Sequence, residues 1–330
     1  MTNSSESTSV VIAGGGPVGM TLALELARHG IASTLVERNE STTQHPKMDL
    51  TNGRGMELFR RLGMADEARA VGVPEDQDLD ITYATSATGY ILHSFNYGSP
   101  AEYRKRCRDI NDGSMTLEPP MRVSQVKLEP VLKKAIDENP LVDVNFGWIF
   151  ENFDQDDSGV SCKIVKTNSG ETRELYCQYL AGCDGGGSKV RKIAGIELEG
   201  EFGIVPVYMV HFKSTDLEVL AKFGAAYHLQ TANGTLIAQN GKDTWTLHVV
   251  MPPETNLESI NAGDLLRRFA GQDFEFEILV ANHWTPHQVV AERYREGRVF
   301  LAGDAAHQFV PTGGYGMNTG IWDAADLGWK

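Results

Sequence analysis

The residues from Gly14 to Gly19 have the glycine spacing of a phosphate-binding turn between a strand and a helix. Gly14 permits the tight turn, Gly16 lets a pyrophosphate approach the backbone, and Gly19 allows the helix to pack closely on the strand. The N-terminus of that helix would direct its free N–H groups at the phosphates. Pro17 suits the first helical turn, where a missing N–H costs nothing. Glycine-rich turns are common, so this pattern alone is weak evidence.

A carboxylate further along the chain strengthens the case for a dinucleotide site. Glu37 ends the next expected strand, 18 residues past Gly19, where such sites place an acceptor for ribose hydroxyls. A solvated charge at a strand end would explain Glu37 taken alone. Together with the preceding strand, turn and helix, however, Glu37 predicts a dinucleotide site.

Two further glycine–aspartate turns follow expected strands, at Asp184-Gly185 and at Gly303-Asp304. An aspartate just past a strand lies at the carboxyl edge of a sheet, where open α/β folds bind their ligands. A turn with a capping aspartate explains either one about equally well. The presence of all three turns in this order is far more specific.

These turns require a sheet and helices to hold them, and the hydrophobic pattern predicts both. The expected elements are a strand, helix and strand in 9–37, helices in 53–62, 124–138 and 314–329, strand-like stretches in 142–180 and 205–295 with a helical patch at 265–269, and a short strand at 298–302. The order is therefore α/β first, then β-rich, then α/β again.

The 330-residue chain carries 44 acidic and 30 basic side chains, which gives a formal net charge of −14. This acidity argues against nucleic-acid binding and against docking on anionic membranes. No uncharged apolar run approaches the ~20 residues of a membrane span, and the polar N-terminus is unlike a signal peptide. The four cysteines lack CxxC spacing, so we expect reduced thiols. We expect no metal site and a cytoplasmic location.

Taken together, these motifs resemble those of class A flavoprotein monooxygenases, the family of para-hydroxybenzoate hydroxylase and the phenol hydroxylases. The resemblance covers nearly the whole chain. It is carried by the three turns, by Arg191 after the second one, and by the segment 311–330. Weaker family signatures are found at 45–47, 54–58 and 122–125.

The resemblance implies an α/β fold with a Rossmann-like FAD-binding domain and a β-rich substrate domain. The FAD-binding domain is expected in residues 1–75, 120–200 and 295–330, and the substrate-binding domain in 76–119 and 201–294. Family members continue for tens of residues of helices that help to close the active site. We therefore expect the C-terminal helical part to be missing after Lys330.

The resemblance also implies FAD as cofactor and NADPH or NADH as co-substrate. The residues that it assigns to FAD are Gly14, Gly16, Pro17, Val18, Gly19, Glu37, Arg54, Gln125, Asp184, Asp304, Gly314, Gly316, Met317 and Asn318. At Met317 and Asn318 a glycine loop runs into a helix, so free N–H groups at its positive end would stabilise the negative charge of reduced flavin. A loop that merely caps a helix explains neither the length of the glycine run nor its place.

Four residues are candidates for catalysis. The resemblance implies that Pro311 lies beside the isoalloxazine ring. His228 and Tyr208, together with His248, lie in the region expected to line the substrate pocket, where they could accept or relay a phenol proton. Histidines and tyrosines in strands are more often core residues. His307 lies in the third turn, where a structural histidine is at least as good an interpretation as a catalytic one.

The function that the resemblance implies is hydroxylation of a phenolic or other small aromatic molecule. In that family, NAD(P)H reduces FAD, O₂ adds at flavin C4a, and the hydroperoxide transfers its distal oxygen to the ring. The alternatives are an epoxidase, a decarboxylating hydroxylase, an oxidase, or a truncated FAD-binding protein without turnover. Lys47 stands where the family often has arginine, which keeps the charge but loses the planar fork. A homodimer is a further expectation.

Overall fold

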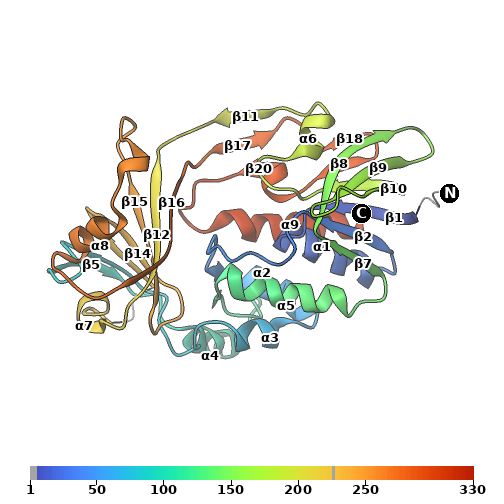
Figure 1. The fold of residues 1–330 in the computed structure, drawn as a ribbon. Coiled ribbons are helices and arrows are strands. Elements are labelled where there is room, and N and C mark those ends of the chain that lie inside the picture. The colour runs from blue at the N-terminus through green and yellow to red at the C-terminus, as the bar shows by residue number, and fades with distance from the viewer. Residues whose placement is uncertain (1–5, 225–226) are drawn as a thin grey trace.

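The structure, a computed structural model, describes residues 6–224 and 227–330 and has the expected α/β fold (Figure 1). A mainly parallel sheet organises its first lobe. β1 (Glu6–Ala13) lies between β10 (Thr172–Gly182) and β2 (Ser33–Glu37), and both pairings are parallel. β7 (Val142–Phe146) extends the sheet beyond β2, and β19 (Val299–Leu301) extends it beyond β10. The carboxyl ends of these strands therefore share one edge, where the three predicted turns begin.

Shorter strands complete this lobe. The antiparallel additions to the large sheet are β8 (Trp148–Gln155), β9 (Val160–Lys166) and β18 (Arg295–Glu296). A three-stranded sheet contains β11 (Leu198–Glu201), β17 (Gln288–Ala291) and β20 (His307–Gln308), and β3 (Leu50–Thr51) pairs with β6 (Met121–Arg122).

Three helices pack together against the large sheet. α1 (Pro17–Arg28) begins after Gly16 with a proline in its first turn and buries most of its length between α5 (Gln125–Asp137) and α9 (Tyr315–Trp329). Leu22, Leu132 and Ile321 belong to one buried apolar cluster, which is the core of this lobe. The expected helices at 53–62, 124–138 and 314–329 correspond to α2 (Gly53–Arg61), α5 and α9.

Four short or exposed helices do not follow an apolar period and were not predicted from the sequence. They are α3 (Ala65–Ala70), α4 (Pro100–Ile110), α6 (Lys189–Ile193) and α7 (Leu217–Leu220). In α4 only Pro100 is buried, and the helix is fixed at its start by a capping box between Ser99 and Glu102. Two 3₁₀ turns are η1 (Leu257–Ser259) and η2 (Gly303–Ala305).

A seven-stranded sheet forms the second lobe, on the left in Figure 1. Its spatial order is β16 (Glu277–Trp284), β12 (Val207–Lys213), β15 (Thr244–Val250), β14 (Gly234–Ala238), β13 (His228–Thr231), β4 (Ile81–Ala84) and β5 (Ile91–Phe95). One face packs on α8 (Ala262–Ala270) through an apolar core that includes Phe212 and Phe269. The other face contacts the first lobe.

Arg122 connects the two lobes through buried contacts. It is only 2% exposed, and its guanidinium donates to the backbone carbonyl of Ala238 in β14 and lies over the ring of Tyr227, 4.9 Å from its centroid. An arginine so deeply buried needs such partners, because an unpaired buried charge is very unfavourable. None of the helices in the described ranges is both long and apolar enough to cross a membrane. All four cysteines are free thiols.

The core of the second lobe makes a direct prediction. Phe269 is 1% exposed where α8 packs on the sheet, so Phe269→Ala should lower the free energy of unfolding by about 3–5 kcal/mol. Ile278→Ala is the matched control in the same lobe, because Ile278 is 40% exposed in β16 and its truncation should cost much less. Urea unfolding followed by far-UV circular dichroism measures both. Equal losses would contradict the placement of Phe269 in the core.

Candidate functional site

The first turn, between β1 and α1, is shaped by the absence of side chains. A Cβ on Gly14 would lie 2.2 Å from the carbonyl oxygen of Cys183, and one on Gly19 would lie 1.9 Å from the carbonyl oxygen of Gly14. The φ of Gly14, +111°, also disfavours any other residue. Gly16, by contrast, has nothing within 4 Å of its Cβ position. The turn thus leaves open space beside Gly16 at a helix N-terminus, which fits the pyrophosphate of FAD.

Val18 and Pro17, which the resemblance assigned to FAD, have visible structural roles. Pro17 occupies the first position of α1. Val18 packs where the first and third turns meet. A Cβ added to Gly303 would lie 2.9 Å from Cγ2 of Val18, and a Cβ added to Gly320 of α9 would lie 2.7 Å from the same atom. Val18 therefore joins three segments that are distant in sequence.

Glu37 lies beside the first turn, as its place at the end of β2 predicts. Its Oε2 accepts a hydrogen bond from the backbone N–H of Gly15 at 2.8 Å, and its Oε1 accepts one from the backbone N–H of Asn39 at 2.8 Å. These bonds orient the carboxylate at the sheet edge. Binding of a ribose by Glu37 stays a prediction.

Asp184 acts in the structure as a capping residue for α6. Its carboxylate accepts hydrogen bonds from the hydroxyl of Ser188 at 2.5 Å, from the backbone N–H of Lys189 at 2.6 Å and from that of Val190 at 3.1 Å. The capping alternative thus describes what Asp184 does in the chain itself, and its contact with FAD stays a prediction.

The second and third turns are tied to each other and to α9. Arg191 donates to the carbonyl of Gly186 at 3.1 Å and to that of Ala305 at 3.2 Å. His307 is buried, and its Nε2 lies 2.5 Å from Oδ2 of Asp323 in α9. These contacts favour the structural interpretation of His307.

Asp304 projects from the third turn into a recess. Its side chain is reached by solvent, yet surrounding protein desolvates the carboxyl and raises its pKa above the usual value. The neighbouring His307 and Lys47 oppose that rise in the pKa of Asp304. A carboxylate placed in this way can accept hydrogen bonds from a polyhydroxyl chain, as the assignment to the ribityl chain of FAD requires.

Asn318 fixes the start of α9 through its side chain. It is 3% exposed; its Oδ1 accepts from the N–H of Asn52 at 2.9 Å, and its Nδ2 donates to the carbonyls of Leu50 at 2.9 Å and Gly314 at 2.8 Å. The sequence drew attention to its backbone N–H, whereas the structure shows a side chain that holds the helix terminus in position. In Figure 1 this N-terminal end of α9 is directed toward the seven-stranded sheet.

The first turn of α9 is open at Gly316, because a Cβ there meets nothing within 4 Å. Met317 follows in the first turn of the helix, which supplies free N–H groups. The carbonyl of Pro311 accepts from the N–H of Gly314 at 3.0 Å, so the proline closes the loop. Its place beside a flavin ring stays a prediction.

Two other residues assigned to FAD differ in accessibility. The Arg54 side chain is 64% exposed and pairs with Glu57 at 2.8 Å, so it is available to a ligand. The Gln125 side chain is buried and donates to Oε1 of Glu129 at 2.7 Å. Gln125 would have to leave that partner, or use its carbonyl oxygen, to contact a cofactor.

On the polar face of the seven-stranded sheet, the predicted His228 is accompanied by two residues that the sequence did not reveal, Asp49 and Tyr227. The hydroxyl of Tyr227 donates to Oδ1 of Asp49 at 2.9 Å, and its ring stacks on that of His228 with centroids 3.9 Å apart. Burial raises the pKa of Asp49 to about 6, and burial next to Arg122 lowers that of His228 to about 3. Asp49 and Tyr227 belong to no sequence motif. A carboxylate in a loop also leaves no periodic pattern in the sequence from which its role could be predicted.

The strand register separates the predicted pair His228 and Tyr208. Met209 pairs with His248, which shares the polar face with His228, so Tyr208 as the adjacent residue points to the opposite face. There Tyr208 is buried in the core beneath α8. The structure therefore does not bring Tyr208 to His228, and Tyr227 takes the place beside it.

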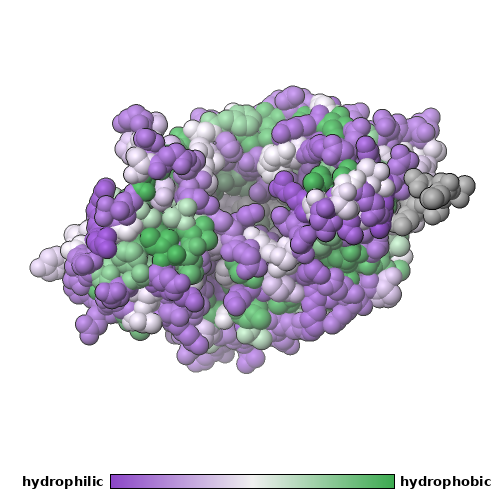
Figure 2. Space-filling model, viewed as in Figure 1, coloured by the Kyte–Doolittle hydropathy of each residue, from purple (hydrophilic) through white to green (hydrophobic). Residues whose placement is uncertain are grey.

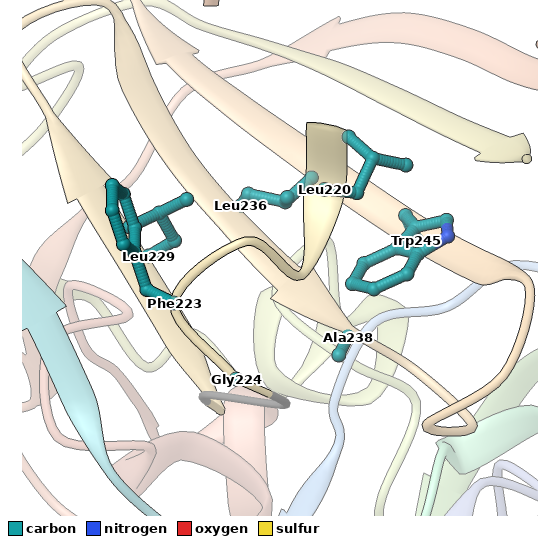
Figure 3. Close-up of a pocket in the computed structure, with 7 residues that line it drawn as sticks. All are labelled: Leu220, Phe223, Gly224, Leu229, Leu236, Ala238 and Trp245. Carbon is teal, nitrogen blue, oxygen red and sulfur yellow. The ribbon is translucent and has the colours of Figure 1, made fainter. Parts of the chain in front are cut away.

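The small cavity in Figure 3 lies on that same core side of the sheet. It is lined by Leu220, Phe223, Gly224, Leu229, Leu236, Ala238 and Trp245, and its volume is about 10 Å³. That is room for about one water molecule and not for an aromatic ring. Figure 2 instead shows the surface hollowed between the two lobes. No group of three or more His, Cys, Asp or Glu side chains within residues 6–224 and 227–330 is placed to hold a metal ion.

The glycine turn yields a contrast between two variants. Gly16→Ala should lower the free energy of unfolding without FAD by no more than about 1 kcal/mol, the cost of alanine at the helix N-cap, because the new Cβ meets no atom. It should nevertheless bind FAD at least tenfold more weakly, because that Cβ enters the space left for the pyrophosphate. Gly14→Ala should destabilise the chain even without FAD. Urea unfolding and FAD fluorescence titration measure both effects.

Gly187→Ala is the control, because its Cβ also meets no atom and it lies in the second turn. Unchanged FAD affinity in Gly16→Ala would contradict the proposed position of the pyrophosphate.

Asp49 provides a pH-dependent prediction. The pKa of Asp49 is raised from 3.8 to about 6 in the folded chain. Ionisation of Asp49 therefore destabilises the folded chain increasingly between about pH 4 and pH 6 and by a constant amount at higher pH. Asp49→Asn keeps an acceptor for Tyr227 and should be more stable than the wild type by on the order of 2–3 kcal/mol at pH 8. The difference should vanish at low pH. Unfolding in urea at several pH values tests this, with Asp109→Asn in the exposed helix α4 as control. A difference that stays constant with pH would refute it.

Known proteins are similar to this chain in sequence and in fold. A family model described as an FAD binding domain matches residues 7–330. The FAD-dependent monooxygenase apdD of Emericella nidulans is 42% identical to this chain in an alignment of 343 residues. The alignment covers 98% of this chain and 55% of that protein. This chain thus spans about half the length of that relative.

Solved structures agree. K252c-soaked RebC superposes with a TM-score of 0.88 at 34% identity, covering 99% of this chain and 61% of RebC. A ternary complex of aklavinone-11 hydroxylase with FAD and aklavinone gives a TM-score of 0.88 at 30% identity, covering 99% of this chain and 62% of the hydroxylase. These matches confirm the resemblance carried by the three turns, Arg191 and the segment 311–330. The chain belongs to the FAD-binding domain family of class A flavoprotein monooxygenases.

Proposed function

We propose that this chain binds FAD and an aromatic substrate in an NAD(P)H-dependent monooxygenase that hydroxylates a phenolic or other small aromatic molecule. The observation that carries the proposal is the joining of the three turns at one sheet edge, with α9 directed from that edge toward a polar sheet face. Residues 1–75, 120–200 and 295–330 would serve the cofactor, and 76–119 and 201–294 the substrate.

The similar proteins support an aromatic substrate. The aklavinone-11 hydroxylase was solved with both FAD and aklavinone, so the same fold holds a cofactor and a substrate together. The fold alone does not determine the reaction. The polar face and the recess between the lobes supply the additional support in this chain (Figure 2).

Backbone groups would carry most of the cofactor binding. The N–H groups at the start of α1 would bind the pyrophosphate, and those at the start of α9, held by Asn318, would face the flavin ring. Bound FAD, once reduced by NAD(P)H, would supply the oxygen-transfer chemistry with O₂. Pro311 would lie along the ring, and the two lobes would exclude water from it.

Asp49 is the best-matched proton acceptor on the polar face. Its pKa of about 6 is close to neutral pH, whereas the pKa of about 3 makes His228 a poor base. A phenol proton would pass to Oη of Tyr227 as the Tyr227 proton moves to Oδ1 of Asp49, along the 2.9 Å hydrogen bond. We therefore propose that His228 orients the substrate or Tyr227 and that Asp49 takes the proton.

The test uses the full chain. Purified protein should carry the absorption spectrum of bound FAD, and phenol, resorcinol or 1-naphthol should stimulate its oxidation of NADPH or NADH. Mass spectrometry after reaction under ¹⁸O₂ should show a product that has gained one labelled oxygen atom. Asp49→Asn should slow product formation at least tenfold at pH 7 while FAD stays bound.

Three outcomes would count against the proposal. Colourless protein that takes up no FAD would exclude it, and bound flavin without substrate-stimulated oxidation would favour a binding role without turnover. Product without the label would exclude oxygen transfer from O₂. A cytoplasmic location is a further proposal, which cell fractionation tests. A homodimer is another, which size-exclusion chromatography tests.

A further inference from the structure

A hydrogen bond between His45 and Asn282 connects the two lobes next to this polar face. His45 lies in the loop after β2, Asn282 lies in β16, and His45 Nε2 is 2.7 Å from Asn282 Nδ2. The remaining polar atoms of both side chains, His45 Nδ1 and Asn282 Oδ1, are buried and have no partner in the part of the chain that the structure describes. Buried polar atoms in folded proteins normally have partners, so this pair requires an explanation.

The pair offers one donor and one acceptor. Since an amide Nδ2 only donates, Nε2 of His45 accepts, and the proton of the neutral ring resides on Nδ1. His45 Nδ1–H is then a donor and Asn282 Oδ1 an acceptor. If the amide is turned over, Nε2–H donates to Oδ1, which leaves Nδ1 as acceptor and Nδ2 as donor. The inventory is the same in both arrangements.

His248 continues this group on the same face. Asn282 and His248 both pair with Met209, from the strands on either side of it. Nδ1 of His248 is likewise buried without a partner among the described residues, and its ring packs edge-to-face on Trp284 with centroids 6.1 Å apart. Three unpartnered polar atoms therefore lie on one face of the sheet, beside an aromatic ring.

The side chains of this group carry no positive charge, and Lys47, whose charge acts on His45, is exposed, so that solvent screens it. Burial lowers the pKa of His45, of His228 to about 3 and of His248 to about 4, so all three rings are neutral at pH 7. The charge of the buried cation nearby, Arg122, interacts with that of Asp49, and its guanidinium donates to the backbone carbonyls of Asp78 and Ala238. A carboxylate on a substrate would thus meet hydrogen-bonding atoms here but no available buried cation.

We propose that His45, Asn282 and His248 form a substrate subsite that selects an uncharged ring bearing one oxygen group that donates and one that accepts a hydrogen bond, as in a catechol. The subsite discriminates against benzoate-type anions, because its buried atoms carry no charge and solvent screens the charge of the neighbouring Lys47. This inference rests on the proposed function, since the substrate would lie over the same sheet face. It specifies the class of substrate and the residues that choose it.

Isothermal titration calorimetry of the full chain in saturating FAD at pH 7 tests the subsite with two probes of similar size. Catechol is neutral at this pH, and 2-hydroxybenzoate replaces one hydroxyl by a carboxylate. Catechol should bind at least tenfold more tightly. Asn282→Leu and His45→Phe keep the side-chain volume but remove the polar atoms. Each should weaken catechol binding at least tenfold and bring the affinities for catechol and 2-hydroxybenzoate closer together.

His283→Phe is the matched control, because His283 neighbours Asn282 in β16 but is exposed on the opposite face. His45→Gln should restore part of the affinity, because an amide again offers a donor and an acceptor. Melting temperatures and FAD content verify that each variant is folded. If a variant fails to fold, the wild-type comparison of the two probes still decides the matter.

Equal or tighter binding of 2-hydroxybenzoate by the wild type would overturn the proposal. The proposal would also be overturned if Asn282→Leu and His45→Phe bound catechol as tightly as His283→Phe does. In that case water alone would satisfy the unpartnered atoms of His45 and Asn282. Failure of the proposed function differs from either outcome. In that case catechol binds with the stated preference and the stated sensitivity to substitution, but no labelled product forms.

Discussion

The site depends on how closely backbone segments approach one another where side chains are absent. Gly14 lies against the carbonyl of Cys183, and Val18 lies against Gly303 and Gly320. Any side chain at these glycines would hold β1, the third turn and α9 apart. The shared edge of the parallel sheet, on which the cofactor assignment depends, exists only because these positions are glycine.

A second constraint is electrostatic. The interface between the lobes buries Arg122, Asp49 and Tyr227 next to several histidines. The guanidinium of Arg122 has backbone carbonyls and an aromatic face as partners, and the charge of Asp49 acts on it. The neighbouring rings lose their charge because burial lowers their pKa. The result is a polar surface of nearly balanced charge, and this balance bears on what it can recognise.

The sequence predicts the first lobe well, because its glycine turns and apolar helices are local signals. The helix α4 escapes prediction since capping at Ser99 fixes it, while its exposed faces carry no apolar period. Tyr208 and Tyr227 show a different limit. Which tyrosine reaches His228 depends on strand register, and a shift of one residue reverses the face. The long-range partners of Asp49, His45 and Asn318 likewise arise only when the chain is folded.

The route of the chain between the lobes has a mechanical consequence. The backbone leaves the first lobe after α3 and again after β11, and it returns at β6 and at β17. Several covalent connections of this kind, together with the buried guanidinium between them, leave no single hinge about which one lobe could swing. The two lobes should therefore unfold as one cooperative unit, and opening the recess for a ligand should involve loops rather than rigid-body rotation.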